Sequence, residues 1–130
     1  MISEDYVSFE TAELLKEKGF NDVPVYTYYL SYGGFYMSPM AVTNKNLYAQ
    51  GHIAAPTLQM AIKWLREVHN LFIFISTWLR HKDGTVQYYY EIRNLNDKDF
   101  ETIAESTITE FDSLEKTCEA AIKYCLENLI

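Results

Sequence analysis

Apolar residues recur at helical spacing in three segments of the chain. The first segment begins after Ser8, a good N-cap, and ends at Gly19, where a left-handed residue closes a helix. The second is expected to open with Pro56 at its first helical position, and the third follows the capping-box spacing Asp112–Glu115. The buried stripes predicted for these helices are Phe9, Ala12 and Leu15 or Leu14; Leu58, Ala61, Ile62, Leu65 and Val68; and Leu114, Cys118, Ala121, Ile122, Cys125 and Leu129.

Alternating patterns between the first two helical segments predict extended chain. A β-rich run after Pro24 and a second run at 35–37 flank Gly33-Gly34, which favours a two-residue hairpin turn. This turn places Leu30 opposite Met37 and Tyr32 opposite Phe35. A short third strand is expected at Leu47–Ala49.

The strongest hairpin signal lies at residues 71–95. Asp83-Gly84 between two β-rich runs favours a type I′ turn, which places Phe74 opposite Arg93 and Leu79 opposite Tyr88. One face, the predicted core face, then carries Ile73, Ile75, Thr77, Leu79, Tyr88, Tyr90 and Ile92. The other, the predicted outer face, carries Phe72, Phe74, Ser76, Trp78, Arg80, Gln87, Tyr89, Glu91 and Arg93.

The remaining pattern completes an α+β fold. Residues 96–101 predict a turn, and 103–111 alternate like a third strand, although a short helix at 98–105 also fits. A chain of 130 residues is expected to form one domain, residues 1–130, in which antiparallel hairpins pack against three helices in the order α-βββ-α-βββ-α. The triplets Leu15-Lys16-Glu17 and Leu65-Arg66-Glu67 raise the hypothesis of an internal repeat.

Charge and cysteine usage narrow the partners and the compartment. The net charge of −7 argues against duplex nucleic acid as a partner, although the basic middle of the chain leaves a small anionic ligand open. The acidic start predicts no secretory signal, and the longest strongly apolar run, Leu71–Ile75, is too short to cross a membrane. Cys118 and Cys125, seven apart on one helix, lie too far apart for a disulfide. A cytoplasmic protein is expected.

No motif in the sequence predicts catalysis, a cofactor or a metal site. His52, His69 and His81 have no ligand-spaced neighbours. Asp97-x-Asp99-x-Glu101 begins like a calcium loop, but that loop requires Gly at its sixth position, where this chain has Thr102. We therefore expect a solvated acidic turn and a protein that is not an enzyme.

Tyrosine is the unusual feature of the composition, with eleven residues. Tyrosine fills half-buried sheet faces well, which is one interpretation. The other is a contact surface, because aromatic residues and arginine dominate binding hot spots. The candidate interaction surface is Phe74, Trp78, Arg80, Tyr89 and Arg93 on the outer face of the 71–95 hairpin. Its partner is an unknown protein or a second copy of the chain. The alternative function is a binder of a nucleotide-like small ligand, or a minor enzyme, with a pocket between the central helix and the tyrosine-rich strands.

Three segments carry a family resemblance. They are VSFETAELLKEKGF at 7–20, APTLQMAIKWLREVH at 55–69 and EAAIKYCLENLI at 119–130. These segments resemble small uncharacterised proteins carried by gut Bacteroidales and their phages and prophages. The resemblance implies an intracellular, phage- or prophage-encoded protein. The family has no assigned activity, so the resemblance transfers no catalytic or binding residue.

Overall fold

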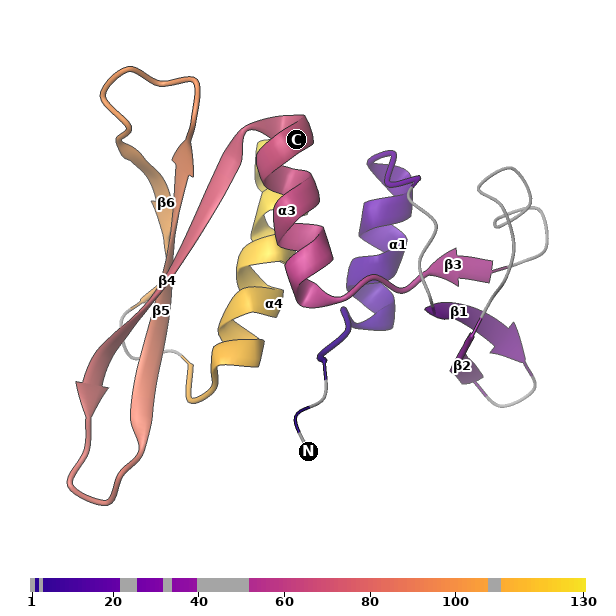
Figure 1. Ribbon diagram of the computed structural model, residues 1–130, viewed down its shortest axis with the longest axis horizontal. Helices are drawn as coiled ribbons and strands as arrows, with labels where there is room; N and C mark the ends of the chain where they lie inside the picture. Colours follow the sequence, from indigo (N-terminus) through magenta and orange to yellow (C-terminus); the bar gives the residue numbers. More distant parts are fainter. Residues whose placement is uncertain (1, 3, 22–25, 32–33, 40–51, 108–110) are drawn as a thin grey trace. The chain divides into compact units, whose positions relative to one another are not determined.

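The computed structural model describes residues 2, 4–21, 26–31, 34–39, 52–107 and 111–130. Their elements follow the order helix, three strands, helix, three strands, helix, which confirms the predicted α+β class (Figure 1). The elements are α1 Phe9–Glu17, β1 Tyr26–Ser31, β2 Gly34–Pro39, β3 His52–Ala54, α3 Leu58–His69, β4 Leu71–Arg80, β5 Val86–Asn94, β6 Thr102–Glu105 and α4 Leu114–Tyr124, which continues into a π-helical turn, Cys125–Leu129. Among the described residues, no helix has both the length and the apolar character needed to span a bilayer.

The chain divides into two compact units, Met1–Ala61 and Ile62–Ile130. The division falls inside α3, which is one continuous helix. Each unit contains one three-stranded antiparallel sheet, with the orders β2-β1-β3 and β4-β5-β6. The central strand is β1, the first in the chain, in one sheet and β5, the second of its three strands, in the other. The two α-βββ segments therefore differ in topology. This difference argues against a simple internal repeat. The single domain stays a prediction.

Helix α1 has the two ends that its sequence predicts. The Ser8 side chain accepts a hydrogen bond from the Thr11 N–H, and Gly19 has a φ of +94°. The Phe20 N–H then donates to the Leu15 carbonyl at 2.9 Å, so the chain folds back over the last turn as expected. Phe20 is 1% exposed. Leu15 is also 1% exposed, so Leu15, and not Leu14, belongs to the buried stripe of α1.

The first hairpin has a different register from the predicted one. Leu30 lies opposite Phe35 rather than Met37, and Ser31 lies opposite Gly34, which belongs to a strand. Tyr32-Gly33 and Gly33-Gly34 each contain a glycine, so the sequence alone allows either pair to connect the strands. The predicted pairing of Tyr32 and the predicted strand Leu47–Ala49 fall outside the described residues.

Helix α3 begins two residues later than predicted. The first helical residue is Leu58 and not Pro56, and the hydroxyl of Thr57, directly before it, accepts a hydrogen bond from the Met60 N–H at 3.1 Å. A threonine hydroxyl can cap the first turn in this way, whereas a proline side chain has no acceptor. Asn70 follows the helix with a φ of +57°, as expected for its C-terminal end.

The predicted buried stripe of α3 is wrong at its last position. Ala61 and Leu65 are fully buried, but Val68 is 57% exposed. Helical spacing places Val68 on the same side as these two residues. Its exposure shows that the packed side of the helix does not include this position.

The register of the second hairpin also differs from the predicted one. Phe74 pairs with Glu91, and Arg93 pairs with Phe72, so each residue of the regular part of β4 meets β5 two positions earlier than expected. One of these two positions is lost at the turn, in which the Gly84 N–H donates to the His81 carbonyl and the His81 N–H to the Thr85 carbonyl. The other is lost at Trp78, where β4 has one extra residue. Gly84 has a φ of +92°, whereas Asp83 is not among the residues of positive φ. A type I′ turn needs positive φ at both residues, so this is a three-residue turn closed by glycine.

We expect Gly84→Ala to lower the free energy of unfolding by about 1–2 kcal/mol, because an L side chain is strained at positive φ. An added Cβ would meet no atom within 4 Å, so the loss of stability would come from backbone strain and not from a steric clash. Denaturant unfolding measures it. Gly84→Asn is the matched control and should lose less, since asparagine tolerates this region better. Equal stability of the alanine variant and the wild type would contradict this turn geometry.

A β-bulge interrupts β4 near its end. Thr77 pairs with Tyr88 and Leu79 pairs with Gln87, which leaves Trp78 as the extra residue. Beyond the bulge, Arg80 lies opposite Val86. One extra residue reverses the alternation of faces, so the predicted face assignment of Arg80 is wrong.

The structure of the C-terminal segment decides between the strand and the short helix that both fit the sequence after residue 97. Residues Thr102–Glu105 form strand β6 along β5, so the helix at 98–105 is excluded, and Phe111 makes an isolated bridge to Tyr88. Ser113, one residue after the predicted start of the capping box, caps α4 by accepting from the Lys116 N–H. The described fully buried residues of this segment are Thr117, Ala121, Ile122, Cys125 and Leu126. Leu114, at 46% exposed, falls outside the stripe predicted for it.

Candidate interaction surface on the second sheet

The sheet β4-β5-β6 has one covered face and one open face. Helix α4 packs on β4 and β5, and within residues 62–130 both helices lie on the same side of the sheet (Figure 1). The covered side buries Leu71, Ile73, Tyr90 and Ile92. We call the opposite side the outer face; it carries Phe72, Phe74, Ser76, Tyr89, Glu91 and Arg93. All six of these residues are half-buried.

Three phenyl rings and one guanidinium gather on the outer face. The ring centres of Phe72 and Phe74 are 4.6 Å apart, and the ring of Phe100 lies 6.4 Å and 6.0 Å from them. The guanidinium carbon of Arg93 lies 5.1 Å from the ring centres of both Phe74 and Phe100. At this distance a guanidinium is attracted to the ring faces. We call these four residues the aromatic–arginine cluster.

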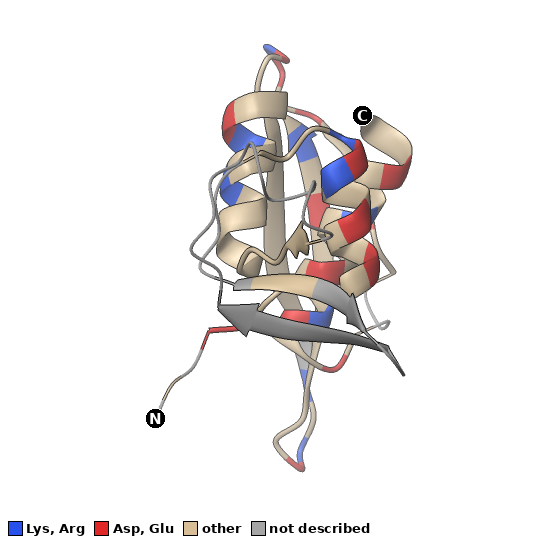
Figure 2. Cartoon of the chain, turned by 90° about the vertical axis from the view of Figure 1, so that its right-hand side faces the viewer, with Lys and Arg blue, Asp and Glu red and all other residues tan. Residues whose placement is uncertain are grey.

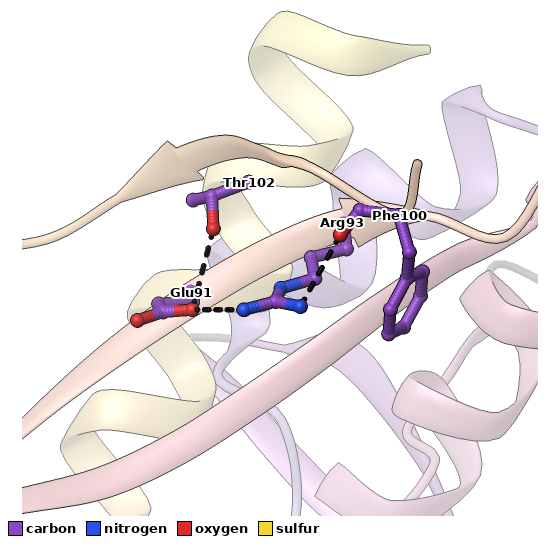
Figure 3. Close-up of polar contacts among 4 residues, drawn as sticks. All are labelled: Glu91, Arg93, Phe100 and Thr102. Atoms are coloured by element: carbon purple, nitrogen blue, oxygen red, sulfur yellow. Dashed lines mark hydrogen bonds and ion pairs between the residues drawn. The ribbon is translucent and has the colours of Figure 1, made fainter. Parts of the chain in front are cut away.

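Polar contacts hold the arginine of the cluster in place. One Arg93 nitrogen, Nη1, donates to the Phe100 carbonyl at 3.2 Å, and Nη2 donates to Glu91 Oε2 at 3.3 Å (Figure 3). The Thr102 hydroxyl donates to the same Glu91 oxygen at 3.3 Å. The third nitrogen, Nε, is buried and has no hydrogen-bond partner in the described part of the chain. The guanidinium is therefore held in one orientation by a carbonyl, a carboxylate and two rings.

The turn between β5 and β6 delivers Phe100 to the cluster. The Asn94 carbonyl accepts from the Asp97 N–H, and the Asp97 carbonyl accepts from the Phe100 N–H, both at 3.2 Å. Asp97 Oδ1 accepts from the Asp99 N–H, so this carboxylate braces the turn. Phe100 has a φ of +53°, which is uncommon for an aromatic residue. Its ring contacts and its hydrogen bond to Arg93 offset the backbone strain.

The structure brings together only some of the residues predicted for the surface. Phe74 and Arg93 meet in the cluster, and Tyr89 lies on the same face opposite Ser76. Trp78, at the bulge, is 54% exposed and makes no ring contact or hydrogen bond within the described residues. Arg80 was predicted on the outer face, and this placement is wrong, because the bulge puts it opposite Val86 on the side of Tyr88 and Tyr90.

Four residues of the site were not among the predicted surface residues: Phe72, Glu91, Phe100 and Thr102. Phe72 and Glu91 were placed on the correct face but not in the predicted surface. Phe100 was assigned only to a turn, although it is the one large apolar residue between Asn96 and Glu101. A lone aromatic residue among charged ones is the signal that could have found it, since such a side chain gains by returning to an apolar surface.

Two of the described tyrosines, Tyr28 and Tyr90, serve packing. Tyr28 is 8% exposed and donates its hydroxyl hydrogen to the Val7 carbonyl at 2.6 Å. Tyr90 is 7% exposed, and its ring lies 6.2 Å from those of Phe111 and Tyr124. These two residues fit the interpretation that tyrosine fills sheet faces. The alternative of a ligand pocket beside the tyrosine-rich strands stays a prediction.

The titratable groups outside the cluster show ordinary structural roles. Cys118 and Cys125 are free thiols, and burial raises the pKa of Cys125 to about 12, so this thiol is protonated and unreactive at neutral pH. His52 Nδ1 lies 2.9 Å from the Thr27 hydroxyl, and the ring of His69 packs edge-on against Trp64. Within the described ranges, no three His, Cys, Asp or Glu residues are grouped closely enough to hold a metal ion.

Comparison with known proteins adds no relative. No protein-family model matches the chain, and neither a curated protein nor a solved structure is similar enough to match it. The resemblance of the three helical segments to small phage and Bacteroidales proteins therefore stays a prediction.

Proposed function

We propose that this chain is a non-enzymatic interaction protein that binds another protein through the outer face of the 71–95 hairpin. The observation that carries the proposal is the aromatic–arginine cluster, which lies on the side of the sheet that the helices of residues 62–130 leave open. A few residues carry most of the binding energy of an interface, with Trp, Tyr and Arg enriched among them, and Phe is also enriched in interfaces. This face combines aromatic residues with arginine.

The fixed guanidinium supports the proposal. A partner that binds a mobile arginine must also order it, which costs about 0.5–1.5 kcal/mol for a side chain of this kind. Arg93 is held by Glu91, by the Phe100 carbonyl and by two rings, so much of that ordering is complete in the unbound protein. Trp78, at 54% exposed, adds a large apolar side chain on the same hairpin.

The cellular setting is part of the same proposal. We place the protein in the cytoplasm, where a reducing environment keeps thiols free, in agreement with the two free cysteines. The resemblance described above extends the proposal to a phage- or prophage-encoded protein acting on a host protein. The proposal names no small ligand, cofactor or duplex nucleic acid as a partner.

We expect Trp78→Glu to abolish most of the partner binding while the fold is kept. The side chain is more than half exposed and lies at a bulge, so a charge there costs little stability but opposes burial in an apolar interface. The measurement is affinity capture from host lysate followed by mass spectrometry, with binding constants for each captured protein. A loss of about 2 kcal/mol, or 30-fold in Kd, is typical of a hot spot.

Val68→Glu is the matched control for this experiment. Val68 is equally exposed, at 57%, but lies on α3 and not on the hairpin. This variant should bind as the wild type does, and circular dichroism should show both variants folded. If Trp78→Glu changes neither partner capture nor self-association, the proposal is wrong.

A further inference from the structure

Strand β4 is an edge strand whose free edge is long and regular. In the order β4-β5-β6, β5 covers only one edge of β4. The Tyr88 N–H donates to the Phe111 carbonyl, and the Tyr90 carbonyl accepts from the Ser106 N–H, so the even-numbered residues of β5 point away from β4. Successive residues of a strand direct their N–H and C=O groups to opposite edges. The odd-numbered residues of β5 therefore bond to β4.

The free edge of β4 can be assigned residue by residue from this alternation. Phe72, Phe74 and Ser76 lie opposite Arg93, Glu91 and Tyr89, so their backbone groups bond to β5. The N–H and C=O groups of Leu71, Ile73, Ile75 and Thr77 must then point outward. Within the part of the chain that the structure describes, the backbone N–H and C=O groups of these four residues have no hydrogen-bond partner.

This edge lacks the features that normally protect an exposed strand. Residues 71–79 contain no charged residue, no proline and no glycine. The charges lie beyond this stretch, at Arg80 and at the hairpin tip, which carries both signs at the bottom of Figure 2. Natural proteins blunt edges with lysine, proline, bulges or short strands. Here the bulge at Trp78 ends the regular part of β4 and leaves its seven residues 71–77 unprotected.

The other edges of the two sheets are protected. Strand β6 has four residues, ends in Glu105 and has a bulge at Ile103. In the first sheet β2 ends at Pro39, and β3 has only three residues. The contrast singles out β4 as the edge that is suited to pair with another strand.

We propose that residues 71–77 of β4 pair antiparallel with the same residues of a second copy of this chain, joining the two sheets into one of six strands. The register that uses all seven residues places Leu71 opposite Thr77 of the partner subunit and Ile73 opposite Ile75 of the partner subunit. Phe74 then lies opposite itself on a two-fold axis perpendicular to the sheet. The pairs Leu71–Thr77 and Ile73–Ile75 each occur twice because of the two-fold axis, which gives four hydrogen-bonded pairs. At two bonds for each pair they supply roughly eight hydrogen bonds.

The segment suits a copy of itself because its centre, Ile73-Phe74-Ile75, is the same in both directions. The antiparallel register sets Ile73 against Ile75 on the helix-covered face and Phe74 against Phe74 on the outer face, and the flanking pairs, Leu71 with Thr77 and Phe72 with Ser76, are uncharged. No charge on the segment repels its copy or requires an opposite charge. A two-fold contact of this kind closes on itself and does not propagate into a filament. The inference concerns the edge and does not rest on the function proposed for the outer face.

Thr77→Pro tests the pairing without removing a bond to β5. Thr77 is exposed and its N–H is not used by β5, so proline removes only the outward donor, and edge strands tolerate proline. Sedimentation velocity over a concentration series should show a monomer–dimer equilibrium in the wild type. We expect its dissociation constant to rise about tenfold or more in Thr77→Pro. The control, Thr77→Val, keeps the N–H and the β-branched shape and should dimerise as the wild type does.

Amide exchange followed by NMR at low and high protein concentration gives a second readout that needs no variant. The amides of Ile73 and Ile75 should become slower as the dimer forms. Those of Phe74 and Ser76 should be slow at both concentrations, because β5 protects them.

A chain that stays monomeric across the series overturns the inference, and so does a dimer unaffected by Thr77→Pro. A dimer that Trp78→Glu disrupts and Thr77→Pro does not would place self-association on the outer face instead. Partner capture by a monomeric Thr77→Pro variant would leave the function proposed above intact.

Discussion

Phe20→Ala should lower the free energy of unfolding by about 3–5 kcal/mol, the usual range for removing a buried phenyl ring. Phe20 is 1% exposed, and its N–H bonds to the Leu15 carbonyl, so the ring is fixed over the end of α1. The surrounding backbone is held by the helix and can collapse little into the cavity. Thermal or denaturant unfolding measures the loss.

The same variant tests whether the chain unfolds as one domain. Phe20 belongs to the unit 1–61, whereas β4 and β5 belong to the unit 62–130. In a single cooperative domain, Phe20→Ala also lowers the protection of β4 and β5 amides against exchange. A loss of protection confined to residues 1–61 would contradict the prediction of one domain. Met60→Ala, at a side chain that is 40% exposed, is the control and should change stability little.

Ile92→Ala should cost about 2–5 kcal/mol by the same mechanism in the second unit. Ile92 is fully buried on β5, the central strand of its sheet, opposite Ile73 on one side and Ala104 on the other. Its side chain faces the helix-covered side, where a cavity is enclosed on all sides. The change in unfolding free energy is again the measurement.

Val68→Ala is the contrasting variant for this experiment. Its helical spacing predicts a buried residue, but its side chain is 57% exposed, so we expect a change of no more than about 0.5 kcal/mol. If Val68→Ala costs as much as Ile92→Ala, the last turn of α3 is packed as the sequence pattern predicts. The structural assignment of that turn would then be contradicted.

Local chemistry explains why much of the fold could be predicted. The two ends of α1 depend on Ser8 and Gly19, whose preferences act within one turn of the helix. The outer and covered faces of the regular part of β4 follow from alternation alone. Although the predicted register was wrong by two residues, a shift of two keeps every residue on its face. Phe72, Phe74 and Arg93 were therefore assigned to the correct face.

The predictions were wrong where the position of a residue depends on residues far away in the chain. The turn at 82–84 could be closed with two or three residues, and the choice depends on how the whole hairpin pairs. The bulge at Trp78 adds one residue, and an odd shift moves Arg80 to the other face. Phe100 reaches the cluster through a turn of positive φ, which its own contacts stabilise.

The sequence by itself determined the class of the fold, the order of its elements, the caps of its first helix and the alternation of the strand that carries the outer face. These features depend on residues close together in the chain, whose backbone preferences and periodicity act locally. Only the tertiary structure decided the two registers, the bulge, the exposure of Val68 and the meeting of Arg93 with Phe74 and Phe100. Each of these depends on which distant surface is available to pack against, and no local preference encodes that.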